Sequence, residues 1–159
     1  RFITPLVPFA ERRTITMKEC IFCKIGRHEA RSWMIAESEH AFSILDIHPM
    51  NRWHTTVMPK AHYENIFDIP VEVLHEVMTI LKYVVNLYNQ KLGIDAVQII
   101  SSNGKIAQQD VFHSHWYIAP RYPNDGQDIK WRLYPEMVSE YHDMLKQLGV
   151  GKFVNAPIR

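Results

Sequence analysis

An alternating pattern in residues 111–118 constrains the fold more than any other part of the sequence. The segment, Val-Phe-His-Ser-His-Trp-Tyr-Ile, is rich in aromatic and β-branched residues, which is typical of a β-strand. Because side chains alternate between the faces of a strand, we expect His113, His115 and Tyr117 on one face. Neighbours on that face are roughly 6.5–7 Å apart. The pattern indicates either a functional row of two imidazoles and a phenol, or a solvated face with incidental histidines.

The composition is that of a folded domain. The chain has 159 residues, of which 47% are hydrophobic and 22% are charged, so it can bury a sizeable core and is not a disordered chain. With a formal net charge of +1 and no local basic patch, it is not expected to bind nucleic acid. No apolar run approaches the ~20 residues that cross a bilayer. We therefore expect no membrane partner and a cytoplasmic location.

The first 16 residues differ from the rest of the chain. They contain two prolines, Pro5 and Pro8, and show no clear hydrophobic period. They also lack the continuous apolar segment that is typical of a secretory signal. We expect an extended N-terminal arm, or residues derived from a vector with Met17 as the natural start. Residues 17–159 are predicted to form a single domain.

The order of the predicted elements indicates an α+β fold. Alternation and bounding turn residues predict strands over residues 32–36, 41–45, 53–58, 96–102 and 111–118. A long helix is predicted from Asp68, as the N-cap, to about Leu92, with Gly93 as its C-terminal stop. A shorter C-terminal helix is predicted from Pro135. Since strands and helices do not alternate strictly, we expect an antiparallel sheet with helices on one face.

The only cysteines, Cys20 and Cys23, form a C-x-x-C pair. In a reducing compartment such a pair is either a redox motif or half of a metal site. The residues before the pair make a poor buried strand, which disfavours a thioredoxin-like motif. The nine histidines can supply the two further ligands of a tetrahedral zinc site. The spacing therefore favours zinc, with a redox pair or plain buried thiols as alternatives.

Several motifs, taken in chain order, resemble the histidine-triad (HIT) superfamily of nucleotide hydrolases and nucleotidyl transferases. The resemblance covers roughly residues 18–125. It implies a five-stranded antiparallel sheet with a long helix and a shorter C-terminal helix, and a nucleotide bound in a cleft beside the histidine strand. It also implies a homodimer. The motifs are Cys20-Ile-Phe-Cys23-Lys-Ile25, Asp46-Ile47, His54-Thr-Thr-Val-Met-Pro59-Lys60-Ala-His62, Asn103-Gly104, Gln109-Asp-Val-Phe-His113-Ser-His115 and Pro120-Arg121.

The chain departs from the family's working motif, which is H-x-H-x-H, usually preceded by Gly-Gln. His113 and His115 match the first two histidines, whereas Tyr117 takes the place of the third. Gln108 stands where the family usually has glycine, and Gln109 keeps the glutamine. These departures fall within the region that the family uses as its active site.

The resemblance implies that His115 is a nucleophile. Its neutral imidazole would attack the α-phosphorus of a nucleotide, and water or another acceptor would resolve the nucleotidyl-histidine. His54 resembles a fourth histidine that orients the triad, although Trp53 precedes it where the family often has glycine. Tyr117 and Gln109 are candidate donors to phosphate oxygens. Tyrosine is no proton shuttle near neutral pH, so the changes at Tyr117 and Gln108 give the alternative of a HIT-like nucleotide-binding protein with weak or no catalysis.

The resemblance further implies where the nucleotide binds. Asp46 matches the residue that hydrogen-bonds the ribose hydroxyls, and Ile44 and Ile47 would line the base. The phosphate end of the site would be formed by three other residues, which are Asn103, Gln109 and His115. The expected partner is a nucleotide or a nucleotide conjugate, as substrate.

A structural zinc site is the last feature that the resemblance implies. In members with the leading C-x-x-C, both cysteines, the histidine after Pro-Lys-x and the first triad histidine hold the metal. Here these ligands are Cys20, Cys23, His62 and His113, a closed Cys₂His₂ set. Fixing His113 would fix the strand and hence the orientation of His115.

Overall fold

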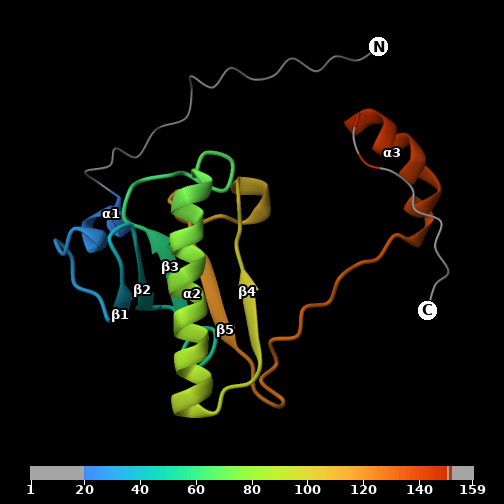
Figure 1. Ribbon diagram of the computed structural model, residues 1–159. Coiled ribbons are helices and arrows are strands. Elements are labelled where there is room, and N and C mark those ends of the chain that lie inside the picture. The colour runs from blue at the N-terminus through green and yellow to red at the C-terminus, as the bar shows by residue number, and fades with distance from the viewer. Residues whose placement is uncertain (1–19, 150, 152–159) are drawn as a thin grey trace. The chain divides into compact units, whose positions relative to one another are not determined.

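The computed structural model describes residues 20–149 and residue 151, and the chain divides into two units (Figure 1). The first unit ends at Gln127 and the second begins at Asp128. The predicted N-terminal arm, residues 1–16, lies outside the described residues. Both the arm and the single domain predicted over residues 17–159 therefore stay predictions.

The first unit is built on one antiparallel sheet. Its strands are β1 (Met34–Glu37), β2 (Ala41–Leu45), β3 (Thr55–Pro59), β4 (Val97–Ile100) and β5 (Trp116–Pro120). Their order across the sheet is β1-β2-β3-β5-β4, and every neighbouring pair is antiparallel. The predicted five-stranded antiparallel sheet is confirmed.

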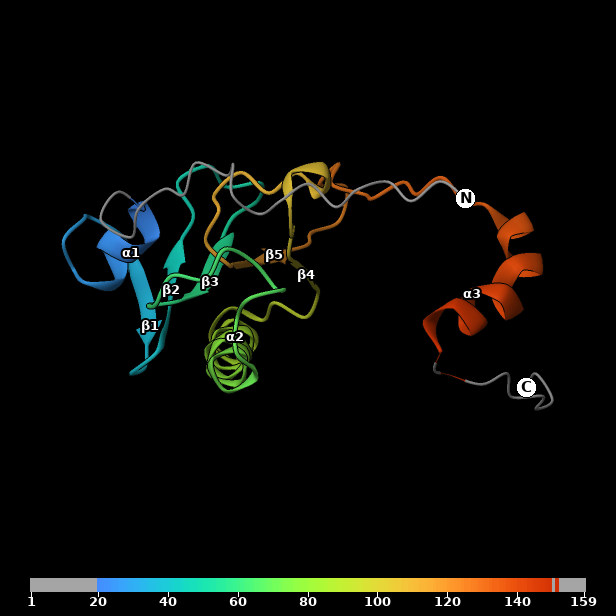
Figure 2. The ribbon, with the colours of Figure 1, turned by 90° about the horizontal axis from the view of Figure 1, so that it is seen from above.

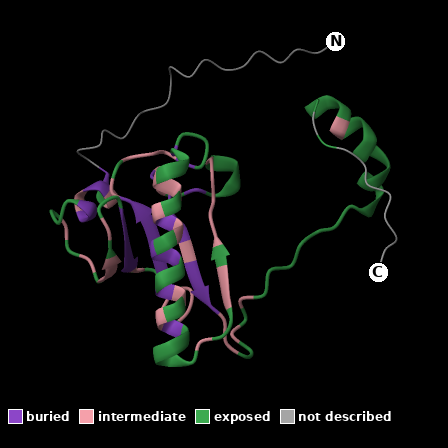
Figure 3. Cartoon of the chain, viewed as in Figure 1, coloured by how far each residue is buried: buried purple, intermediate pink, exposed green. Residues whose placement is uncertain are grey.

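The long helix α2 (Val71–Leu92) covers one face of this sheet, as the two ribbon views show (Figures 1 and 2). Its buried Val77, Leu81 and Val84 pack against Val57 of β3 and Ile118 of β5. Burial of this apolar stripe is the main stabilisation of the layer. The central strands are accordingly the most buried part of the unit (Figure 3).

A short helix, α1 (Ile21–Gly26), covers the opposite face of the sheet. Its Ile25 packs with Phe42 of β2 and Met58 of β3. These two strand residues alternate with Ala41 and Val57, which face α2, so the two clusters lie on opposite sides. We had expected helices on one face only. The cysteine-bearing helix is the exception, and the site described below lies under it.

The histidine strand is shorter than the sequence pattern predicts. β5 begins at Trp116, whereas the pattern predicted a strand over residues 111–118. The backbone N–H of His113 donates to Val111 O at 2.8 Å, and that of Ser114 donates to Tyr63 O at 2.6 Å. These groups therefore bond to loops instead of a neighbouring strand.

The ends of α2 differ in how well the sequence predicted them. Gly93 has φ 67° and closes the helix, as expected, with its N–H on Asn89 O. The N-cap is Pro70 and not Asp68. The Asp68 carboxylate instead accepts the N–H groups of Glu64 and Asn65, both at 2.8 Å, and so closes the turn before the helix.

The second unit contains the predicted C-terminal helix. A 3₁₀ helix, η3 (Pro135–Glu140), leads into α3 (Tyr141–Leu148), which Gly149 ends with φ 67°. In the described part of the chain, no helix combines the length and the apolar composition needed to cross a bilayer.

Candidate functional site

The imidazole of His115 has a defined tautomer and a defined neighbour on each nitrogen. Its Nδ1 lies 2.6 Å from His113 O. A carbonyl oxygen only accepts, so Nδ1 carries the proton and Nε2 carries the lone pair when the ring is neutral. The Tyr117 hydroxyl lies 3.1 Å from Nε2 and donates to it. In the neutral ring, Nε2 is therefore the nitrogen that could act as the predicted nucleophile.

Tyr117 and Asp110 are the two residues described next to the Nε2 atom of His115. The Asp110 Oδ1 atom lies 3.7 Å from His115 Nε2, and the Asp110 side chain is 71% exposed. Burial raises the pKa of Tyr117 to about 12, and the carboxylates of Asp110 and Asp46 add to the shift. The phenol therefore stays protonated at neutral pH and acts as a donor. Asp110 was missed as a site residue, although it lies inside the motif around Gln109.

His115 is covered as well as oriented. Only 2% of the residue is exposed. Its ring lies 5.5 Å from the ring of Phe22 and 5.0 Å from that of Tyr117. Phe22 also contacts the edge of the His113 ring, at 5.7 Å. Phe22 was not predicted as a site residue, and its signal in the sequence is its place between the two cysteines.

His54 lies on the other side of Tyr117, and its ring is 4.9 Å from that of the tyrosine. Its Nδ1 accepts the N–H of Met50 at 3.2 Å, so Nε2 carries the proton. This buried N–H has no partner among the described residues. Burial lowers the pKa of His54, and the charge of Asp46 opposes the shift. His54 is therefore a neutral donor beside Tyr117.

Asp46 and His54 line a cavity of about 430 Å³. The Asp46 carboxylate accepts the hydroxyl of Thr56 at 2.6 Å and the N–H of His48 at 2.8 Å. Of the residues predicted to contact the base, Ile44 is buried in the core beside Phe42, whereas Ile47 is 68% exposed. The other residues that line the cavity are Leu45, Pro49, Asn51, Arg52 and Trp53.

Gln109 and Asn103 hold the loop that precedes the histidines. The Gln109 amide donates to Glu64 O at 2.6 Å and to Val111 O at 3.0 Å, and it accepts the N–H of Gly104 at 2.8 Å. Asn103 accepts the N–H of Ile66 at 2.8 Å. Both amides are thus engaged with backbone groups in this structure.

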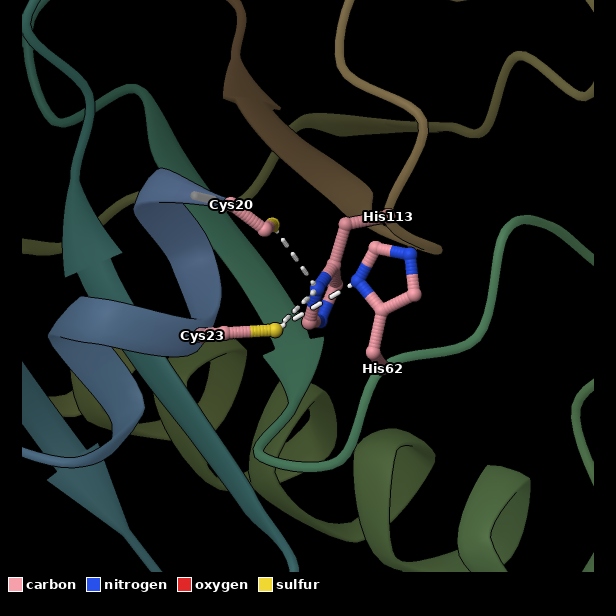
Figure 4. Close-up of side chains that lie close together, drawn as sticks. All are labelled: Cys20, Cys23, His62 and His113. Carbon is pink, nitrogen blue, oxygen red and sulfur yellow. Dashed lines mark hydrogen bonds between the residues drawn. The ribbon is translucent and has the colours of Figure 1, made fainter. Parts of the chain in front are cut away.

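The four predicted metal ligands lie together (Figure 4). The Sγ atoms of Cys20 and Cys23 lie 3.4 and 3.5 Å from His113 Nδ1, and Cys23 Sγ lies 3.4 Å from His62 Nδ1. A tetrahedral zinc ion with ordinary Zn–S and Zn–N bonds separates such atoms by about 3.5 Å. All four ligand atoms lie within 4.8 Å of one another. The cluster therefore fits zinc.

The environment of the cluster also suits a cation. His113 Nε2 lies 2.8 Å from Pro59 O and donates to it, so the Nδ1 lone pair faces the cysteines. Burial and the neighbouring Cys20 raise the pKa of the Cys23 thiol to about 12. Burial lowers the pKa of His113 to about 4. A divalent cation would stabilise the thiolate form of Cys23, which burial otherwise disfavours.

Comparison with known proteins identifies the family. The sequence family described as the HIT domain matches residues 27–124. The chain belongs to the HIT family. An uncharacterised HIT-like protein of Methanocaldococcus jannaschii is 41% identical over 112 residues, which are 70% of this chain and 86% of the relative. An adenosine 5'-monophosphoramidase of Saccharomyces cerevisiae is 35% identical over 102 residues, which are 64% of this chain and 62% of that protein.

A solved structure agrees with the fold of this HIT protein. A Zn-bound histidine triad family protein from Mycobacterium smegmatis matches with a TM-score of 0.64 and 32% identity, covering 83% of this chain and 96% of the other. The zinc belongs to that protein. For this chain, the four clustered ligands show that a metal could be held.

Proposed function

We propose that this HIT protein is a nucleotide hydrolase or nucleotidyl transferase that acts at the α-phosphorus through His115. The observation that carries the proposal is the tautomer of His115, whose Nδ1 is committed to His113 O while Nε2 offers its lone pair. A neutral imidazole held in one orientation is suited to nucleophilic attack. The family includes a relative named as an adenosine 5'-monophosphoramidase, which acts on such a nucleotide conjugate.

In this proposal the chemistry takes two steps. The Nε2 lone pair of His115 attacks the α-phosphorus, and the bond to the leaving group breaks with its electron pair going to that group. Water or another acceptor then attacks the same phosphorus, and the N–P bond pair returns to Nε2. Tyr117 and His54 would donate hydrogen bonds to phosphoryl oxygens. The Tyr117 hydroxyl lies beside His115 Nε2, and the His54 ring lies beside Tyr117.

The other predicted residues have supporting roles. Asp46 would hold the ribose, with Ile44 and Ile47 near the base, and Asn103 and Gln109 would position the phosphate-side loop. Zinc, held by the Cys20, Cys23, His62 and His113 set, would be structural and would supply no chemistry to the reaction. It would anchor α1 and hence Phe22 against the ring of His115. A homodimer stays a prediction.

Mononucleotide release tests the proposal. The protein is incubated with an adenosine phosphoramidate and with a diadenosine polyphosphate, and AMP release is followed by chromatography. We expect turnover by the wild type and by His75→Ala, an exposed histidine on α2, and none by His115→Ala. Equal background rates in the wild type and His115→Ala would exclude the hydrolase.

One observation favours a second candidate, a HIT protein that binds nucleotides with little turnover. His115 is only 2% exposed, and the Tyr117 hydroxyl occupies its lone pair. A nucleotide must displace this hydroxyl before the nitrogen can attack. Calorimetry with AMP measures binding independently of turnover, and binding without AMP release from either substrate would establish this candidate.

The variant Tyr117→His separates the two candidates further. If the phenol impairs the site by occupying the nitrogen, turnover rises in this variant, which restores the family's third histidine. If the phenol instead donates to a phosphoryl oxygen in the reaction, turnover falls. The matched control is Tyr83→His, because Tyr83 is an exposed tyrosine on α2.

A further inference from the structure

The charge next to the reacting nitrogen is negative and is held in place. The Asp110 Oδ1 atom, 3.7 Å from His115 Nε2, also accepts the N–H of Val111 at 2.8 Å. The loop around it is fixed by the three hydrogen bonds of the neighbouring Gln109 amide. These backbone contacts hold the Asp110 carboxylate beside His115 Nε2.

Two cations of neighbouring elements are paired with other carboxylates. The carboxylates of Asp110 and Asp46 both act, after burial, to raise the pKa of the nearby Tyr117 hydroxyl. Lys60, which follows β3, pairs with Glu37 at 2.9 Å, and Arg121, which follows β5, pairs with Asp125 at 2.8 Å. A site for phosphoryl transfer usually carries cations that balance the substrate's charge. Here it carries an exposed carboxylate within 4 Å of the attacking atom.

We propose that Asp110 is a specificity-determining residue that favours substrates with an amine leaving group over substrates with an anionic one. Phosphate, pyrophosphate and sulfate are examples of the disfavoured groups. This inference rests on the proposed function, since it concerns the leaving group of the same reaction. A carboxylate repels added negative charge and accepts a hydrogen bond from an N–H group, so both effects act in the same direction.

With an amine leaving group, attack by His115 releases a neutral amine. The Nε2 lone pair forms the bond to phosphorus, and the P–N bond breaks with its electron pair going to the leaving nitrogen. That nitrogen takes one proton from solvent and departs as a neutral amine, while Asp110 accepts a hydrogen bond from its N–H. In the second step water adds to phosphorus, its proton goes to solvent, and Nε2 recovers its lone pair.

The position of Asp110 sets the size of the effect. Reacting atoms are about 3–3.5 Å apart before attack, so phosphorus and the carboxylate oxygen lie at similar distances from Nε2. Charges on the leaving group then lie roughly 4–8 Å from the carboxylate. Because the Asp110 side chain is largely exposed, this separation gives about tenfold discrimination per added charge, which corresponds to about 1.4 kcal/mol.

The experiment compares two substrates that differ only in the leaving group. The kcat/KM is measured for adenosine 5'-phosphoramidate and for adenosine 5'-phosphosulfate, with the wild type, Asp110→Asn and Asp95→Asn. Asparagine keeps the shape and the acceptor for Val111 N–H but removes the charge. Asp95 is an exposed carboxylate beside Val97, which pairs with Pro120 at the end of β5 farthest from Asp110.

We expect the phosphoramidate-to-phosphosulfate ratio to fall about tenfold or more in Asp110→Asn and to stay unchanged in Asp95→Asn. An unchanged ratio in Asp110→Asn, with turnover still dependent on His115, would overturn the inference and leave the proposed function intact.

A binding measurement makes the inference independent of turnover. Calorimetry gives the Kd of AMP and of ADP, which carries additional negative charge where the leaving group would be. Asp110→Asn is expected to strengthen ADP binding about tenfold relative to AMP binding. If this shift occurs but no substrate is turned over, the inference stands and the catalytic function is wrong. If neither nucleotide binds the wild type, both are wrong.

Discussion

Gln108 stands at a position whose backbone conformation favours glycine. It follows the 3₁₀ helix η2 (Lys105–Ala107) with φ 65° and ψ 27°, in the left-handed region, and its side chain is exposed. This conformation costs a non-glycine residue about 1–2 kcal/mol. Glycine removes that strain but adds about 0.5–1 kcal/mol of backbone entropy to the unfolded chain. Gln108→Gly should therefore stabilise the protein by about 0.5–1 kcal/mol.

The matched control for this variant is Ala107→Gly, one residue earlier in the same exposed turn. Ala107 lies inside η2, so glycine relieves no strain there and should destabilise the protein by about 0.5–1 kcal/mol. Urea unfolding at constant zinc content measures both free energies of unfolding. For a chain of this length, Gln108→Gly should also raise Tm by about 1–4 °C. Equal destabilisation by the two variants would refute the assignment of strain to Gln108.

Three other measurements test the packing, the metal site and the buried histidine. Trp53 also has a left-handed backbone, with φ 68°, but its ring lies 5.7 Å from that of Tyr88. Trp53→Gly should destabilise the protein by about 1–2 kcal/mol, because the packing energy lost with the ring exceeds the backbone strain that glycine relieves. A higher free energy of unfolding in urea would contradict this. Metal analysis should find one zinc per chain. The variant Cys23→Ser should lose this zinc, and its Tm should fall by at least 5 °C. An unchanged zinc content in the variant would exclude the Cys₂His₂ site. Burial lowers the pKa of His54 below its unfolded value of about 6.5, so the unfolded state binds more protons below that pH. Stability should fall on acidification below about pH 6.5, and His54→Gln should make that slope shallower by at most about 1.4 kcal/mol per pH unit. Identical slopes in urea titrations would show that folding does not lower the pKa of His54.

The elements with strong local signals were predicted well. β2 has the predicted bounds, and Gly93 ends α2 as expected, because alternation and a left-handed glycine are properties of short segments. The start of α2 and the length of β5 were predicted less well. Asp68 is a good N-cap residue by type, yet it closes the turn before Pro70. The segment before Trp116 alternates like a strand, yet Ser114 bonds to Tyr63, 51 positions away in the chain.

The sequence alone predicted the α+β sheet and the residue types of the metal cluster and of the histidine row, since these depend on periodicity, motif spacing and chain order. Tertiary structure decided which face α1 covers, which nitrogen of His115 carries the lone pair, and that Asp110 and Tyr117 lie next to it. Such details depend on contacts a few ångströms long between loops distant in the chain, and no local pattern encodes them. The charge beside His115 is therefore a property of the folded protein, although each residue that creates it can be read from the sequence.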